Sequence, residues 1–119
     1  MPNPSLAAVA VEPRSSRSWL DDAVTGGGGT VVDAAEAGAV VWTHQDDPQS
    51  LADLLDTHPQ LAWVQLPWAG VEPYLDIIRR HPDRVWTCGK GVYAEPVAEH
   101  ALGLALAGLR QLAVYARAD

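Results

Sequence analysis

Residues 61–71, with the sequence LAWVQLPWAGV, carry the strongest structural signal in this chain. Six apolar or near-apolar residues precede Pro67, and they predict a short strand that is buried on both faces of a sheet. Proline has no N–H group to donate to a sheet ladder, so Pro67 marks the end of this strand. Gly70 then permits a sharp turn that brings backbone N–H groups close to a ligand. Open α/β sheets place anionic ligands at such turns, although most glycine turns are plain connections.

The segments that follow this turn continue the alternation of helices and strands. Helical spacing of apolar residues from Val71 to Ile78 predicts a helix that the His81-Pro82 pair ends. Residues 85–88 predict the last strand. Residues 94–116 predict one long helix whose apolar side chains cover most of its circumference, so we expect a partner to bury it.

The segments before the turn predict three more strands, at residues 6–11, 30–32 and 39–42. Ser15 and Ser16 are candidate N-caps of a helix that carries Trp19, and Asp47 followed by Pro48 predicts a second helix start. The six residues between the second and third strands are too few for a crossover helix, so a single helical turn is expected there. We expect the tryptophans to be mostly core residues, with Trp63 as an anchor of the core.

This pattern predicts an α/β fold: a flavodoxin-like open parallel sheet of about five strands, with helices on both faces and a long C-terminal helix. We divide the chain into a lobe at residues 1–93 and the helix at residues 94–119. The tetraglycine segment 26–29 follows a helix and precedes a strand, which is the reverse of a phosphate-binding loop. It is interpreted as a helix end and turn.

Composition excludes several classes of protein. The 119 residues carry a net charge of −7, and Lys90 is the one lysine, which argues against a nucleic-acid partner. Cys88 is the single cysteine, so no disulfide framework is expected, and we interpret it as a small buried apolar residue. No signal peptide and no spanning segment are apparent, which predicts a cytoplasmic protein without a membrane partner.

The ionisable residues do not form a recognised catalytic or metal-binding pattern. The four histidines lie in separate segments, and none has the spacing of a ligand pair, so no metal is expected. Glu99 begins an otherwise apolar helix face, where it either caps the helix or orients a ligand loop. Trp68 lies in the turn after Pro67, and there we expect its side chain to line the mouth of a ligand site.

Two segments resemble the D-isomer-specific 2-hydroxyacid dehydrogenases, the family of phosphoglycerate, glycerate and formate dehydrogenases. The first is residues 64–72, with Ala-Gly-Val-Glu at 69–72, and the second is residues 87–110, with Gly91, Val97-Ala98-Glu99-His100 and Arg110. The resemblance covers the whole chain as the family's N-terminal substrate-binding lobe. It implies that the turn of Trp68, Ala69 and Gly70 offers backbone amides to a substrate carboxylate. The turn that contains Lys90 and Gly91 would border the same cleft.

The chain departs from the family pattern in three ways. Glu72 stands where aspartate is usual, and Cys88 and Lys90 replace the commoner asparagine and proline. Lys90 either adds a positive charge for an anionic substrate or is simply solvated. The family's G-x-G-x-x-G loop and its catalytic arginine, glutamate and histidine are missing from these 119 residues, so no catalytic or cofactor-binding residue is predicted.

The resemblance therefore predicts the substrate-binding lobe of an NAD(P)-dependent D-2-hydroxyacid dehydrogenase that is inactive alone. NAD or NADP is the cofactor of the intact family, and none is expected for this chain by itself. The alternative is a free-standing flavodoxin-like module that binds a small acid or a protein without catalysis. A small 2-hydroxy or 2-keto acid is the expected ligand. We also expect the long helix to mediate homo-oligomers (a dimer in the first instance) or to contact a second lobe.

Overall fold

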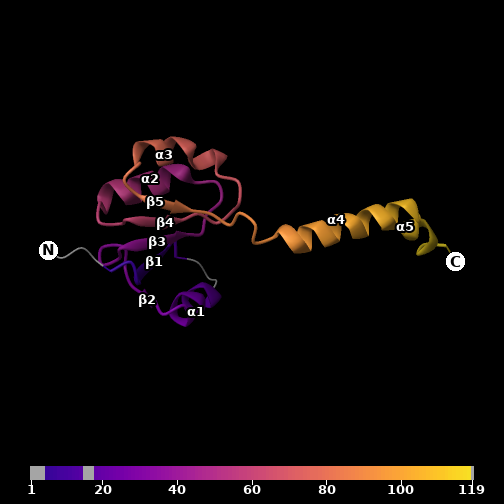
Figure 1. Cartoon of the computed structure of the whole chain (residues 1–119), viewed down its shortest axis with the longest axis horizontal. Helices are drawn as coiled ribbons and strands as arrows, with labels where there is room; N and C mark the ends of the chain where they lie inside the picture. Colours follow the sequence, from indigo (N-terminus) through magenta and orange to yellow (C-terminus); the bar gives the residue numbers. More distant parts are fainter. Residues whose placement is uncertain (1–4, 15–17, 119) are drawn as a thin grey trace. The chain divides into compact units, whose positions relative to one another are not determined.

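The structure is a computed structural model that describes residues 5–14 and 18–118. The chain forms two compact units, Met1–Gly89 and Lys90–Asp119. The first unit is built on a five-stranded, all-parallel sheet with the strand order β2-β1-β3-β4-β5 (Figure 1). Its strands are β1 (Ala8–Glu12), β2 (Thr30–Val31), β3 (Ala39–Trp42), β4 (Trp63–Gln65) and β5 (Val85–Thr87). This order confirms the predicted α/β fold with an open parallel sheet.

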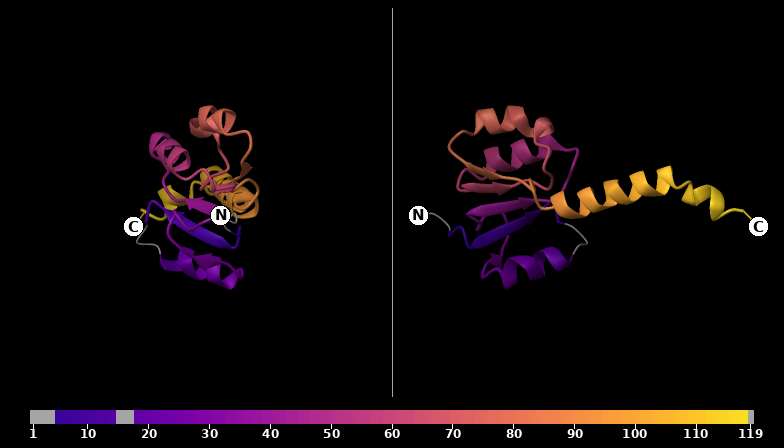
Figure 2. Two further views of the ribbon diagram at one scale, coloured as in Figure 1. Left: turned by 90° about the vertical axis from the view of Figure 1, so that its left-hand side faces the viewer. Right: turned by 45° about the vertical axis from the view of Figure 1, so that its right-hand side comes forward.

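Helices lie on both sides of this sheet (Figures 1 and 2). The helical elements of the first unit are α1 (Ser18–Gly26), α2 (Pro48–Thr57), the 3-10 turn η1 (Glu72–Tyr74) and α3 (Leu75–Arg80). Helices α2 and α3 share one face, and α1 lies on the other beside β1 and β2. As predicted, Asp47 caps α2, because its carboxylate accepts a hydrogen bond of 3.0 Å from the Ser50 N–H. The candidate caps Ser15 and Ser16 lie outside the described residues.

The connection from β2 to β3 contains a turn and no crossover helix. The Glu36 N–H donates to the Asp33 carbonyl at 2.9 Å, which closes a single turn, as the short spacing predicts. Ala34 and Ala37 in this turn are buried, and they belong to the same core as α2. Small side chains therefore let the chain pass close to the sheet where a helix would otherwise lie.

The core of the first unit lies between the sheet and the pair α2 and α3. Its fully buried large side chains are Val40, Leu51, Leu55, Leu61, Val64, Leu66 and Tyr74. In β4, Val64 faces this core, whereas Trp63 and Gln65 point to the opposite face and are only half-buried. The prediction that this strand is buried on both faces is therefore wrong. The cause is that α1 covers β1 and β2 but does not extend over β4.

The tetraglycine segment ends α1, as its position predicts. The Gly29 N–H bonds the Val24 carbonyl at 2.9 Å, and the Gly28 N–H bonds the Thr25 carbonyl at 3.0 Å. Gly28 has a φ of +87°, a conformation that side-chain-bearing residues rarely adopt. This pair of bonds around a left-handed residue is the Schellman arrangement of helix ends.

The second unit contains two helices, α4 (Ala94–Leu109) and α5 (Leu112–Tyr115). The prediction of one continuous helix to residue 116 is wrong, because Gln111 adopts a left-handed φ of +53° and interrupts it. Apolar residues cover most of the circumference of α4, and no residue of α4 is buried. No helix in the described part of the chain has the length and apolarity needed to cross a membrane.

Candidate site at the carboxyl edge of the sheet

The loops that leave β3 and β4 border an open cleft of about 480 Å³. Parallel strands end at the same edge of a sheet, so these two loops meet although about 20 residues separate them. The lining residues are Gln45 and Asp46 after β3, and Trp68, Gly70, Glu72, Pro73 and Tyr74 after β4. The cleft therefore lies at the carboxyl edge of the sheet, one strand away from the β1/β3 position where the strand order reverses.

The turn after β4 presents a run of unused hydrogen-bond donors. Among the described residues, the backbone N–H groups of Ala69, Gly70 and Val71 donate no hydrogen bond. The strand pairing ends three residues earlier, where the Leu66 N–H still donates to the Thr87 carbonyl at 2.8 Å. Consecutive free N–H groups in a turn are a common binding element for anions.

Tyr74 fixes the loop on the opposite side of the cleft. Its hydroxyl lies 2.7 Å from the His44 carbonyl oxygen and 3.0 Å from that of Gln45, and it donates to these acceptors. The side chain is 1% exposed, and this burial raises the pKa of Tyr74 above its ordinary value of 10.0. The phenol therefore keeps its proton near neutral pH and remains a donor that holds the loop after β3.

The charged side chains of the cleft are both acidic. A Cβ atom built on Gly70 would lie 2.9 Å from Oε2 of Glu72, so this carboxylate lies directly against the turn. Asp46 contributes a second carboxylate from the other loop. These two negative charges repel an anionic ligand, so the attraction that binds it must come from the free N–H groups.

The end of β5 supports the same turn. The Gly89 N–H donates to the Trp68 carbonyl at 3.1 Å. A Cβ atom at Gly89 would lie 3.4 Å from the Pro67 carbonyl oxygen, an ordinary van der Waals distance, so the two segments are in contact here. This contact fixes the position of the backbone that carries the free N–H groups.

The residues predicted for the site divide between the two units. Trp68, Ala69 and Gly70 form the turn in the first unit, and the Trp68 side chain is 40% exposed where it lines the cleft. Lys90 and Gly91 belong to the second unit, and both are exposed. Sequence reasoning missed Gln45, Asp46 and Tyr74 as lining residues. Gln45 and Asp46 lie within four residues of the end of β3, so the rule that places ligands at strand ends could have found them.

The described residues offer no assembled metal site. Among residues 5–14 and 18–118, no three His, Cys, Asp or Glu side chains cluster in a way that could hold an ion. Cys88 is half-buried and packs against the core, in agreement with its interpretation as an apolar residue. The titratable side chains among the lining residues of the cleft are the carboxylates of Asp46 and Glu72 and the phenol of Tyr74.

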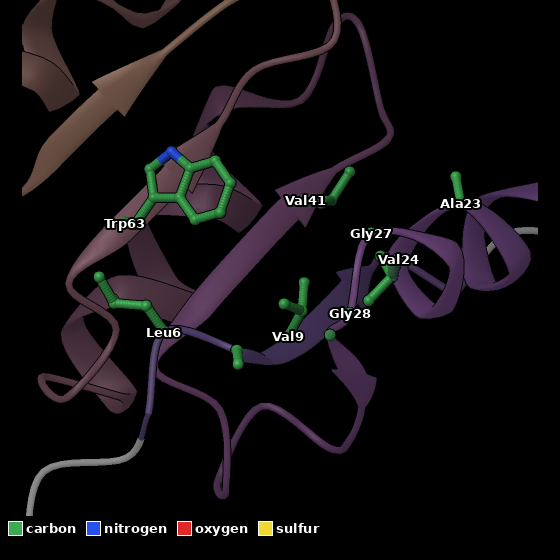
Figure 3. A pocket seen from close by; sticks show the side chains of 10 residues that line it. Leu6, Val9, Ala23, Val24, Gly27, Gly28, Val41 and Trp63 are labelled. Carbon is green, nitrogen blue, oxygen red and sulfur yellow. The ribbon is translucent and has the colours of Figure 1, made fainter.

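A second cleft lies on the other face of the sheet, between α1 and the strands (Figure 3). Its volume is about 290 Å³, and its walls are apolar, with Leu6, Val9, Val24, Val41 and Trp63 among them. The Trp63 indole N–H donates to Thr87 Oγ1 at 2.7 Å. The lining side chains offer no charge to an anion, so this cleft is not the candidate site for an acid.

No protein-family model, curated protein or solved structure matches this chain. The resemblance to the 2-hydroxyacid dehydrogenases thus stays a prediction from residues 64–72 and 87–110. The geometry at the carboxyl edge of the sheet is the independent observation that bears on function.

Proposed function

We propose that the first unit binds a small 2-hydroxy or 2-keto acid in the cleft at the carboxyl ends of β3 and β4. The observation that carries this proposal is the run of three free backbone N–H groups at Ala69, Gly70 and Val71. In the fuller form of the proposal, the unit is the substrate-binding lobe of an NAD(P)-dependent D-2-hydroxyacid dehydrogenase in the cytoplasm. The sequence resemblance supports this fuller form.

Backbone N–H groups suit a carboxylate because they hold partial positive charge in a fixed geometry. The contact between Gly89 and Trp68 fixes the turn in advance, so little conformational freedom is lost when the acid binds. Glu72 weakens the binding of an acid, because its carboxylate lies against Gly70 and repels the negatively charged ligand. The side chain of Glu72 is exposed and free to move toward solvent.

We expect the Glu72→Gln substitution to strengthen binding of hydroxypyruvate by about three- to tenfold, because it removes one negative charge near the ligand carboxylate. Isothermal titration calorimetry on the full chain at low salt measures this change. Dihydroxyacetone, in which a hydroxymethyl group replaces the carboxylate, is the matched neutral ligand, and it should show no saturable binding to the parent or to the variant.

Glu36→Gln is the matched protein control, because it removes the same charge from an exposed turn before β3, at the opposite edge of the sheet. It should leave hydroxypyruvate affinity within about twofold of the parent. Equal effects of the Glu72 and Glu36 substitutions would place the acid elsewhere. No saturable binding of hydroxypyruvate or glyoxylate to any variant would contradict the proposed function.

We also expect this chain alone to turn over no D-2-hydroxy acid or 2-keto acid with NAD(H) or NADP(H). The sequence has no G-x-G-x-x-G loop to hold the cofactor, and the described cleft offers no histidine side chain as a proton donor. An absorbance assay at 340 nm with glyoxylate and NADH checks this expectation. Steady oxidation of NADH above a protein-free blank would contradict it.

A further inference from the structure

A series of side-chain hydrogen bonds joins the ends of β4 and β5 on the face of the sheet opposite α2 and α3. The Trp63 indole N–H donates to Thr87 Oγ1 at 2.7 Å, and the Thr87 hydroxyl donates to Gln65 Oε1 at 2.6 Å. The Gln65 Nε2 group then donates to the Leu66 carbonyl oxygen at 2.8 Å. The series therefore ends on the first residue after β4, just before the turn that carries the free N–H groups.

The neighbours of the Gln65 amide leave it only one orientation. An indole N–H can only donate, so Thr87 Oγ1 is its acceptor and the hydroxyl proton is free to be donated onward. A backbone carbonyl can only accept, so the nitrogen of the Gln65 amide must face Leu66. The Thr87 hydroxyl also lies 3.5 Å from the Val64 carbonyl, a contact too long to compete with the bond to Gln65. The threonine therefore holds the amide nitrogen on the Leu66 carbonyl.

The Leu66 carbonyl is the oxygen that the turn would otherwise use to close on itself. In a β-turn, the carbonyl of the first residue accepts from the N–H of the fourth, and proline is favoured at the second position. Residues 66–69 have the sequence LPWA, which fits this pattern, and the chain bends there. The Ala69 N–H nevertheless donates no hydrogen bond. The turn is therefore open, and its natural acceptor is occupied by a side chain from the strand.

The same arrangement recurs two residues further along the turn. The Trp68 carbonyl is the corresponding acceptor for the Val71 N–H, and the Gly89 N–H donates to this carbonyl at 3.1 Å. The Val71 N–H is also free. In both places a donor from outside the turn occupies the local acceptor, so an N–H group of the turn is left for a ligand.

We propose that Gln65 is a positioning residue that keeps the Ala69 N–H free by occupying the Leu66 carbonyl. A carbonyl oxygen has two lone pairs, so the amide acts by holding this oxygen away from the turn rather than by saturating it. Without the amide, the turn closes through Leu66 and Ala69, and fewer molecules have an open turn. The affinity for an acid then falls by the same factor as the open fraction. This last step rests on the proposed function, whereas closure of the turn does not.

Gln65→Met removes the amide, keeps a side chain of similar length and so tests this role directly. Solvent-exchange NMR of the ¹⁵N-labelled full chain should show about three- to tenfold slower exchange of the Ala69 N–H. Hydroxypyruvate binding, measured by calorimetry, should weaken by the same factor. Slower exchange is distinctive, because a substitution that merely loosens the structure would make exchange faster. Unchanged or faster exchange at Ala69 would overturn the proposal.

Gln60→Met is the matched control. The Gln60 Nε2 group also donates to backbone carbonyls, those of Ala34 at 2.8 Å and Ala35 at 3.2 Å. This variant loses the same kind of bond at the amino edge of the sheet, so exchange at Ala69 should stay within about 1.5-fold of the parent. Equal slowing in the Gln60 and Gln65 variants would overturn the proposal.

Thr87 tests the preceding hydrogen bond of the series. Thr87→Ser keeps the hydroxyl and should leave exchange at Ala69 within about 1.5-fold of the parent, whereas Thr87→Val should slow it about two- to fivefold. Equal results for serine and valine would overturn the positioning of Gln65 by this hydroxyl. Slower exchange in Gln65→Met without hydroxypyruvate binding to any variant or to the parent would support the control of the turn and contradict the proposed function.

Discussion

Replacement of Trp42 by alanine should lower the free energy of unfolding by about 3–5 kcal/mol. Trp42 lies at the end of the central strand β3, it is 3% exposed, and it belongs to the core under α2 and α3. Alanine would leave a cavity there that neighbouring strands cannot close, because hydrogen bonds on both sides hold β3. Urea unfolding followed by far-ultraviolet circular dichroism measures the loss without relying on tryptophan fluorescence.

Trp63→Ala is the matched control, and it should cost only about 1–2 kcal/mol. Trp63 lies on the open face of the sheet, is half-buried, and makes one side-chain hydrogen bond, to Thr87. The expectation from sequence that Trp63 anchors the core is therefore wrong, and Trp42 has that role. Equal losses in the two variants, or a larger loss for Trp63, would contradict the description of the two faces.

Tyr74→Phe should lower the free energy of unfolding by about 1–3 kcal/mol, because it leaves the His44 and Gln45 carbonyls without their donor. The same substitution should also make the loop after β3, which borders the cleft, more mobile. Tyr115→Phe removes the same hydroxyl from a residue that is 71% exposed, and it should change stability by less than about 0.5 kcal/mol.

The effect of Tyr74 should depend on pH with a defined sign. Folding raises the pKa of Tyr74 above its ordinary value of 10.0 through burial, so the folded state favours the protonated phenol. The contribution of the Tyr74 hydroxyl to the free energy of unfolding is fully present below about pH 10, and it is lost as the pH rises through the raised pKa. The stability difference between parent and Tyr74→Phe should therefore be constant from pH 6 to about 9 and shrink above it. A difference that instead grows at high pH would contradict this assignment.

The fold could be predicted because each element carries a local signal. Asp47 with Pro48 specifies the start of α2, and the glycines at 26–29 specify the end of α1. Strands alternate with helices along the chain, and a parallel sheet covered by helices is the arrangement that buries the apolar segments of such a chain. The burial of Trp63 could not be predicted in the same way, because it depends on where α1 lies across the sheet.

The site could be predicted only in part. The turn at Trp68–Gly70 follows from Pro67 and Gly70, which are local signals. The donation from Tyr74 to the loop after β3 spans about 30 residues, so no local pattern reveals it. The interruption of the C-terminal helix at Gln111 was also missed, because apolar spacing continues through residues 112–114 without a break.

We propose that the backbone N–H groups of Ala69, Gly70 and Val71 bind the carboxylate of a small 2-hydroxy or 2-keto acid. A titration of the ¹⁵N-labelled full chain with hydroxypyruvate, followed by ¹H–¹⁵N correlation spectra, tests it directly. We predict saturable shifts that are largest at these three amides and absent with dihydroxyacetone. Shifts that leave residues 69–71 unmoved, or that dihydroxyacetone reproduces, would contradict the claim.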